Sequence, residues 1–276
     1  MLSGIVASLA VAAAAYGLYA FLLHPALLSP LARIPSAHWS CAVSGLWILA
    51  ARRRGRENRS LGDAHRRLGR VVRVAPNALS VDGVDAVRAV YQAGFDKWPW
   101  YSVFDNYGLP CLFSTLGAGP HARRKRALSH VYSKSYVQAS AAAAAQARAV
   151  LLGRLLPLLR REAAAADPGG TEVQAVLMAT TMDLVSAYVF GLAGGTAFLL
   201  DEPYRRRWLR LYLCRHRNHF WSQELPGLAA LCARLGLRLE PPAVDAANEE
   251  LRAWNKRLCD RAAAAPPPAA PPAAPR

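Results

Sequence analysis

The chain has 276 residues, 53% of them hydrophobic, and a formal net charge of +16 at pH 7. This length allows one or two domains with a substantial core. The basic residues are 30 Arg and four Lys alongside long Ala and Pro runs, a skew that fits compositional bias as well as selection for phosphate binding. Because zinc-finger spacing, RNA-recognition aromatics and a basic heptad region are all missing, the sequence predicts no nucleic-acid partner.

The amino end is apolar. Residues 4–23 read GIVASLAVAAAAYGLYAFLL without a charge, enough to cross roughly 30 Å of hydrocarbon as a helix. No Lys or Arg precedes this stretch, whereas an Arg-rich run follows at residues 52–56. By the positive-inside rule we predict a transmembrane anchor over residues 1–24, ending at His24 and Pro25, that crosses once with the body facing the cytosol. A secretory signal peptide and a buried core helix are the alternatives.

Four short elements are predicted after the anchor. Two helix-breaking prolines indicate a proline-containing hinge over residues 25–50. Residues 56–68 have helical periodicity. Residues 70–81, RVVRVAPNALSV, alternate valine with other residues around a Pro-Asn pair, which predicts a strand, a turn and a strand. Asp82 is then expected to cap a short helix over residues 82–91.

An aromatic-rich loop comes next. The residues proposed to line an apolar substrate pocket are Trp98, Trp100, Tyr101 and Phe104. Concave ligand sites are usually lined by apolar and aromatic side chains, which supports this interpretation. The alternative is that the cluster belongs to the core or to a membrane-contacting surface.

Residues 112–136, LFSTLGAGPHARRKRALSHVYSKSY, combine a turn, a helix start and a cluster of cations. The Gly and Pro residues before His121 predict a helix that begins near Pro120. His121 and Lys125 then share one face, because residues four apart lie together on a helix. Like charges repel at this spacing and the macrodipole disfavours cations in a first turn, so a bound anion is the predicted compensation. A solvated basic face is the alternative.

The rest of the chain is predicted to be mostly helical. Residues 135–161 should form a helix kinked at Pro157, and a turn should follow at residues 167–170. An apolar helix is expected over residues 171–192, capped by Thr171.

The last third of the sequence mixes aromatic and basic residues. Residues 201–228 suit a helix at a membrane interface, with an ordinary amphipathic surface helix as the alternative. His216 and His219 lie three apart, but no third ligand has suitable spacing, so we expect no metal site. The Ala/Pro-rich residues 261–276 predict a disordered tail.

The cysteines indicate the redox compartment. They are Cys41, Cys111, Cys214, Cys232 and Cys259. Their odd number and scattered spacing predict reduced thiols in a cytosolic compartment and no disulfide framework.

Several segments resemble one family. HARRKRALSHVYSKSY, with LFST before it, resembles the C-helix region of fungal membrane-bound cytochrome P-450 proteins, the heme-thiolate monooxygenases. GRVVRVAPNALSV and DKWPWYS are close to fungal members, and TTMDLVSAYVFGL resembles the family's E helix. The resemblance runs from residue 1 to about residue 260, roughly the N-terminal half of a full-length member. It implies a mainly α fold with a small β-sheet, an incomplete cytochrome P-450 fold from the A to about the G helix, with a partial monooxygenase domain at residues 51–260.

The resemblance also implies a cofactor site. In the family, a Trp or His and a basic residue four positions later hold the two heme propionates, which corresponds here to His121 and Lys125, with Arg126 beside them. The family more often has Arg at the Lys125 position, and Lys neutralises a propionate without making a bidentate fork. The family's aromatic loop covers the substrate near the heme. The E-helix match implies these core residues: Met178, Met182, Tyr188 and Phe190.

Other family motifs are missing in context: the acid-Thr pair for oxygen activation, the K-helix Glu-x-x-Arg, and the Cys loop that supplies the axial thiolate. None of the five cysteines has the required Phe and Gly neighbours. We therefore expect heme as the cofactor by resemblance, with no catalytic residue and no axial metal ligand in this chain.

By resemblance, the chain is an N-terminal fragment of a heme-dependent monooxygenase that oxidises a small apolar substrate with molecular oxygen and is inactive as given. The expected partners are the membrane, that substrate and, for a full-length protein, an NADPH-dependent reductase. The expected location is the endoplasmic reticulum membrane. Two alternatives stay open, a non-enzymatic membrane-anchored interaction module and a basic surface that binds lipid or nucleic acid.

Overall fold

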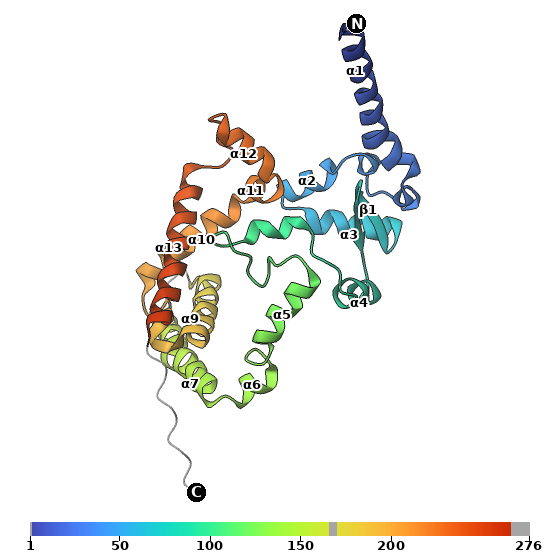
Figure 1. The fold of residues 1–276 in the computed structure, drawn as a ribbon. Coiled ribbons are helices and arrows are strands. Elements are labelled where there is room, and N and C mark those ends of the chain that lie inside the picture. Colours follow the sequence, from blue (N-terminus) through green and yellow to red (C-terminus); the bar gives the residue numbers. More distant parts are fainter. Residues whose placement is uncertain (1, 166–169, 266–276) are drawn as a thin grey trace. The chain divides into compact units, whose positions relative to one another are not determined.

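The computed structural model describes residues 2–165 and 170–265 and divides into two compact units, Met1–His121 and Ala122–Arg276 (Figure 1). Helices dominate both units, and a two-stranded sheet lies in the first. The predicted mainly α class with a small β-sheet is therefore confirmed.

The first unit begins with a long apolar helix. α1 spans Leu2–Leu18 and continues as π-helical turns at Tyr19–Leu28. The predicted end of this helix at Pro25 is wrong, because the wider π-helical turn leaves room for a proline ring that an α-helical turn would not. Among the described residues, three helices are long and apolar enough to cross a membrane by length and composition. They are Gly4–Leu28, Ala141–Ala165 and Val173–Gly194.

Short elements make up the rest of the first unit. They are the 3-10 helices Pro30–Arg33, Trp39–Ala42 and Pro99–Phe104, the helices α2 (Leu46–Arg53), α3 (Glu57–Leu68) and α4 (Val84–Gln92), and the strands β1 (Val71–Ala75) and β2 (Ala78–Val81). The predicted helix over residues 56–68 and the antiparallel hairpin are confirmed. Gly83, at φ 102°, caps α4 in place of the predicted Asp82. The N–H of Asp82 donates instead to the carbonyl of Arg70 at 2.9 Å, which extends the hairpin.

A small core packs against β1. Its buried residues are Ala37, Cys41, Ala64, Val72 and Val74, and partly buried Trp47, Leu61 and Leu68 pack against them. The alternation of the strand predicts Arg73 on the opposite face from the valines. That face is also covered, since Arg73 is 1% exposed and its guanidinium donates to the carbonyls of Ala42 at 3.3 Å and Pro76 at 2.7 Å.

α5 spans Ala118–Ser129, so it starts two residues before the predicted Pro120. The elements that follow are α6 (Lys134–Ala139), α7 (Ala141–Val150), the π-helical turn Leu151–Leu155, α8 (Leu156–Ala165), α9 (Val173–Gly194), α10 (Glu202–Arg217), α11 (Phe220–Glu224), α12 (Pro226–Arg234) and α13 (Pro242–Ala264). The predicted single helix over residues 135–161 is wrong. Ser140 separates α6 from α7 because its hydroxyl accepts the N–H of Ala143 as an N-cap. Pro157 lies just after the π-helical turn Leu151–Leu155, inside a helical run that is continuous from Ala141 to Ala165.

The second unit is built around an aromatic core. Phe198, Trp208 and Trp254 contact one another, with ring centroids 5.4 to 6.3 Å apart. α13 packs along α10 and α9, as Figure 1 shows. Three of the residues implied as core pack against it while partly buried: Met178, Met182 and Phe190.

Two predicted features fall at the edges of the described residues. α9 is capped by the side chain of Glu172, which accepts the N–H of Ala175, and not by the predicted Thr171. The predicted turn at residues 167–170 lies outside the described residues except for its last residue, and residues 266–276 of the predicted tail lie outside them too. α13 runs to Ala264 and so includes the first residues of that predicted tail.

Candidate functional site

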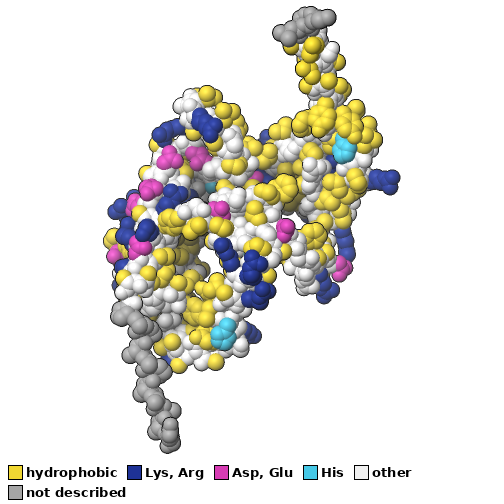
Figure 2. Space-filling model, viewed as in Figure 1, with side chains coloured by type: hydrophobic (Ala, Val, Ile, Leu, Met, Phe, Trp, Pro, Cys, Tyr) yellow, Lys and Arg dark blue, Asp and Glu magenta, His cyan; other side chains and the backbone are white. Residues whose placement is uncertain are grey.

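The cations predicted to bind an anion lie on α5. Arg123, Arg124, Lys125 and Arg126 are all exposed, and His121, in the first turns of the helix, is half-buried. Figure 2 shows these basic side chains gathered over α5 as a dark blue cluster. The helix therefore presents four consecutive cations to solvent, as the sequence predicts.

Some of these cations have no counter-charge in the part of the chain that the structure describes. Within residues 2–165 and 170–265, neither Lys125 nor Arg126 forms an ion pair with a carboxylate. Elsewhere the same kind of exposed helix surface is paired, as for Arg206 with Glu202 and Lys256 with Asp260 at 2.5 and 2.6 Å. α5 thus keeps a local excess of positive charge.

The amino end of α5 is held by a distant carboxylate. Asp96 Oδ1 accepts the backbone N–H of Ala118 at 2.7 Å. α5 has no acidic residue of its own in the first turn. Asp96 therefore satisfies one of the unpaired N–H groups at the helix start and places a negative charge near the positive end of the helix dipole.

The aromatic residues before α5 form a ring cluster, which we call the aromatic lobe and define as residues 98–116. Trp100, Tyr101, Phe104 and Phe113 meet edge to face with centroid separations of 5.1 to 5.3 Å. Trp98 lies outside the cluster and is 71% exposed. The structure therefore brings together three of the four residues predicted to line a substrate pocket and adds Phe113.

Lys97 binds the lobe at its start. Its ammonium donates to the carbonyls of Leu112 at 3.2 Å and Phe113 at 2.6 Å, and lies 5.7 Å from the ring centroids of Tyr101 and Phe113. The sequence does not single out Lys97 or Phe113, because their partners lie about 15 positions away along the chain. The nearest signal is the DKWPWYS segment that carries part of the family resemblance.

The lobe also contains a bonded cysteine. Ser114, 1% exposed, accepts the N–H of Cys111 at 2.9 Å, and its hydroxyl donates to the thiol sulfur at 3.4 Å. The Ser114 hydroxyl lowers the pKa of Cys111, because the hydrogen bond favours the thiolate. Burial raises the pKa of Cys41, which is fully buried in the core of the first unit.

A second charged cluster is entirely internal. Asp183 on α9 is fully buried and accepts from Thr196 Oγ1 at 2.7 Å, the N–H of Phe198 at 2.8 Å and Arg154 Nη1 at 3.1 Å. The sequence does not reveal this network, because its members come from separate elements. All its groups are partnered, so it holds the connection between α9 and α10 in place.

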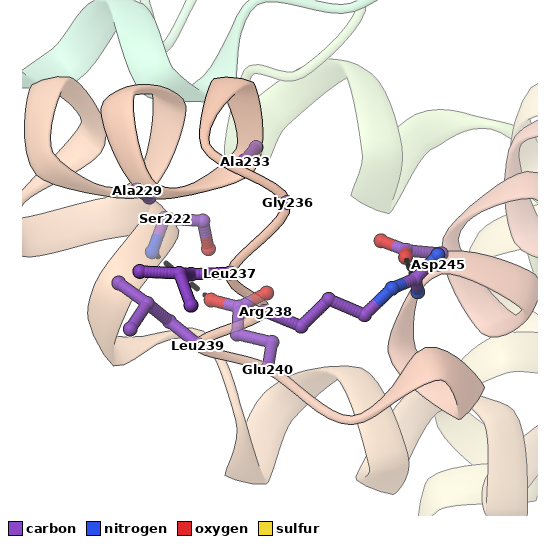
Figure 3. A pocket seen from close by; sticks show the side chains of 9 residues that line it. All are labelled: Ser222, Ala229, Ala233, Gly236, Leu237, Arg238, Leu239, Glu240 and Asp245. Carbon is purple, nitrogen blue, oxygen red and sulfur yellow. Dashed lines mark hydrogen bonds and ion pairs between the residues drawn. The ribbon is translucent and has the colours of Figure 1, made fainter.

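Among the hollows of the second unit, one lies between α11, α12 and α13 and another between α9 and α10. Figure 3 shows one of about 390 Å³, in which Arg238 pairs with Asp245 at 3.1 Å and Glu240 accepts the N–H of Ser222 at 3.0 Å. Arg238 and Asp245 thus neutralise each other, and Glu240 is bonded to a backbone N–H. The other, of about 550 Å³, is an apolar groove along α9 and α10.

The two neighbouring histidines were considered as metal ligands. His216 and His219 stack with centroids 5.3 Å apart. Across the described part of the chain, no three His, Cys, Asp or Glu side chains gather in a way that could hold a metal ion.

The chain is similar to known proteins over part of its length. The chain is 32% identical over 115 residues to the cytochrome P450 monooxygenase gsfF of Penicillium aethiopicum, covering 40% of this chain and 23% of that protein. It is 33% identical over 164 residues to the cytochrome P450 monooxygenase avaI of Aspergillus versicolor, covering 55% of this chain and 39% of that protein. This chain is a relative of the fungal cytochrome P450 monooxygenases. The predicted family resemblance is therefore confirmed.

The match to cytochrome P450 proteins is partial. A third relative, the benzoate 4-monooxygenase bphA of Aspergillus niger, is 33% identical over 94 residues, covering 33% of this chain and 18% of that protein. The chain thus spans well under half the length of the curated relatives it matches. No family model matches the chain, and no solved structure matches it. Heme is the cofactor that the cytochrome P450 family implies.

Proposed function

We propose that this chain supplies the propionate-binding helix and part of the substrate pocket of a heme-dependent monooxygenase. The observation that carries the proposal is the cluster of exposed cations on α5, where Lys125 and Arg126 have no carboxylate partner among the described residues. The sequence of that helix resembles the segment in which the cytochrome P450 family binds the heme propionates.

The donors on α5 suit two propionates. A propionate is a carboxylate, and charge-assisted hydrogen bonds from imidazole, ammonium and guanidinium groups are the strong ones in proteins. We assign His121 and Lys125 to the propionates because they lie four residues apart on one helix, and Arg126 to a supporting contact. Bound heme would supply the iron that activates oxygen in this family. The task of these residues is to neutralise and orient the propionates.

The aromatic lobe is the proposed substrate-facing element. Its rings offer edges and faces to a small apolar molecule, and Trp98, exposed beside the cluster, adds another apolar surface. One relative is named for the oxidation of benzoate, an aromatic acid, which supports a ring-containing substrate.

The remaining features fit the same assignment. We assign α1 with its π-helical extension, Gly4–Leu28, as a single-pass anchor in the endoplasmic reticulum membrane, with the body in the cytosol and electrons from an NADPH-dependent reductase. α9 corresponds to the family's E helix, and α10 to α12 to its F and G region. The cysteines of the chain lack the family's ligand loop, so we propose that this chain alone is inactive.

A hemin titration of the full chain in detergent tests the proposal. We expect saturable binding with a shift of the Soret band, and binding about 10-fold weaker or more for the double variant His121→Ala, Lys125→Ala, since each charge-assisted bond contributes substantially. Hemin dimethyl ester, whose propionates carry no charge, is the matched ligand control and should bind equally to both proteins. Lys134→Ala, which removes one positive charge from α6 and none from α5, is the control for lost positive charge.

The outcomes separate the proposal from its alternatives. Unchanged hemin affinity in the double variant would contradict the propionate assignment. No saturable hemin binding by the wild type would favour an interaction module without heme. A thiolate-type spectrum of the reduced carbon monoxide complex would contradict the proposed inactivity of the chain alone.

A further inference from the structure

Two consecutive residues at the start of the aromatic lobe contact its far end and the helix that follows. Asp96 accepts the N–H of Ala118, in the first turn of α5, at 2.7 Å. The backbone N–H of Lys97 donates to the carbonyl of Leu116 at 2.9 Å, and its ammonium donates to the carbonyl of Phe113 at 2.6 Å. The chain segment of the lobe is therefore closed at its base by the Asp96–Lys97 pair.

Lys97 also lies close to two aromatic rings of the lobe. Its ammonium lies 5.7 Å from the centroids of both Tyr101 and Phe113, within the range of cation–π attraction. Those two rings meet edge to face at 5.3 Å. A ring that inserts between them would compete with the ammonium for the faces of these two rings.

Asp96 and Lys97 are adjacent in the chain, so the contacts of Lys97 with the lobe and the contact of Asp96 with α5 are separated by one planar peptide bond. Asp96 in turn fixes the first N–H of α5, and the N–H of His121, one turn later, donates to the carbonyl of Gly117 at 3.0 Å. The contacts thus run without a gap from the rings of the lobe to the helix turn that carries His121.

We infer that Asp96 and Lys97 are positioning residues that couple the aromatic lobe to the first turn of α5. A ring bound against the lobe then changes the order of that turn, and with it the orientation of His121. The cofactor consequence rests on the proposed function, whereas the coupling itself rests on contacts within this chain. A merely structural role for the two residues predicts independent effects of changes in the lobe and at Asp96.

A double-mutant cycle with Tyr101→Leu and Asp96→Ala distinguishes the two roles. The readout is hydrogen exchange at the backbone amides of Ala118, Gly119 and His121 in the full chain, in detergent and without heme. We expect Asp96→Ala to speed exchange about 5-fold, the usual order for a lost helix N-cap, and Tyr101→Leu to speed it by a smaller factor. In the Asp96→Ala background, Tyr101→Leu should have no further effect, because the connection is already broken.

Conservative and control variants complete the cycle. Asp96→Asn keeps an acceptor for the N–H of Ala118 and should restore the response to Tyr101→Leu. Asp105→Ala removes another carboxylate of the same lobe and should leave exchange at the same amides unchanged. If Tyr101→Leu does not fold, judged by circular dichroism, Lys97→Met replaces it in the cycle.

The result that would overturn the inference is multiplicative behaviour, in which Tyr101→Leu speeds exchange by the same factor with and without Asp96. The failure of the proposed function is recognised separately by hemin titration. A non-additive cycle in a chain that does not bind hemin would leave the coupling standing and remove the heme assignment. An additive cycle in a chain that binds hemin would remove the coupling and leave the heme assignment standing.

Discussion

The charges around Asp183 are buried and paired, whereas the charges on α5 are exposed to solvent. Asp183 is fully buried, and Arg154, Thr196 and Phe198 all donate to its carboxylate. The cations of α5 are exposed, and Lys125 has no carboxylate partner among the described residues. The Asp183 carboxylate is thus paired inside the fold, whereas the Lys125 ammonium faces solvent without a carboxylate among the described residues.

The difference separates charges that hold the fold together from charges that are available to a ligand. A buried carboxylate must be paired, because an unpaired charge in a low-dielectric interior is very costly. An exposed cation needs no partner for stability, so a cluster of them can be kept available for a ligand. We therefore expect changes at Asp183 to affect folding and changes on α5 to affect binding.

Removing the Asp183 carboxylate should have the largest effect. Asp183→Ala leaves Arg154, with a side chain 14% exposed, without its counter-charge, and leaves the N–H groups of Phe198 and Leu199 without acceptors. We expect a loss of about 3–5 kcal/mol in the free energy of unfolding, measured by urea denaturation followed by circular dichroism.

A surface ion pair provides the control for this substitution. Lys256 and Asp260 pair at 2.6 Å with both side chains about 60% exposed. Asp260→Ala should therefore cost less than about 1 kcal/mol. An equal loss for the two variants would mean that the buried network does not behave differently from a surface pair.

The same contrast explains what the sequence predicts well. The hairpin at residues 70–81, the helix at residues 56–68 and the cations of α5 depend on spacing within one short segment, and local patterns reveal them. The site residues Lys97 and Phe113 and the Asp183 network depend on contacts between separate segments. Alternation alone does not disclose such contacts, because it reports which face of an element is buried and not what covers it.

Some local patterns mislead because several groups compete for one role. Asp82 has a favourable side chain for capping, yet its N–H belongs to the hairpin and Gly83 takes the cap. Ser140 interrupts a run of helix-forming alanines, because its hydroxyl caps a new helix. Of the predicted pocket residues, Trp98 cannot be separated from the other three by its sequence, since the three meet one another or Phe113 only through packing.

Adding a carboxylate to α5 should raise the stability of the fold and lower its affinity for hemin. Gly119 is exposed in the first turn, and Glu at this position would lie four residues before Arg123 and near the positive end of the helix dipole. Relative to Gly119→Gln, which has nearly the same size and no charge, we expect Gly119→Glu to raise the free energy of unfolding by about 0.5–1 kcal/mol.

Hemin affinity should move in the opposite direction. The new carboxylate competes with a propionate for the cations of α5, so Gly119→Glu should bind hemin about 5-fold more weakly than Gly119→Gln, as expected for a nearby like charge near a protein surface. A variant that gained stability and kept full hemin affinity would show that the propionates do not use this part of α5.

The smallest effect is expected for the reactivity of the Cys111 thiol, which is half-buried and hydrogen-bonded to Ser114. The Ser114 hydroxyl and nearby backbone N–H groups hold the pKa of Cys111 below its ordinary value of 9.0, whereas burial raises the pKa of Cys41 above it. Because the thiolate is the reactive form, iodoacetamide should modify Cys111 at a lower pH than Cys41. The protein is alkylated while folded, and mass spectrometry measures the modification of each cysteine.

The sign of the pH dependence follows from these directions. A lowered pKa in the folded state means that ionised Cys111 stabilises the fold above the ordinary thiol pKa, and that this contribution disappears as pH falls through the folded value. Ser114→Ala removes the donor to the sulfur, so the pH midpoint for alkylation of Cys111 should rise. Ser102→Ala, which removes a hydroxyl bonded to the carbonyl of Pro99 in the same lobe, should leave that midpoint unchanged. Equal shifts in both variants would assign the effect to loosening of the lobe instead of to the Ser114 hydrogen bond.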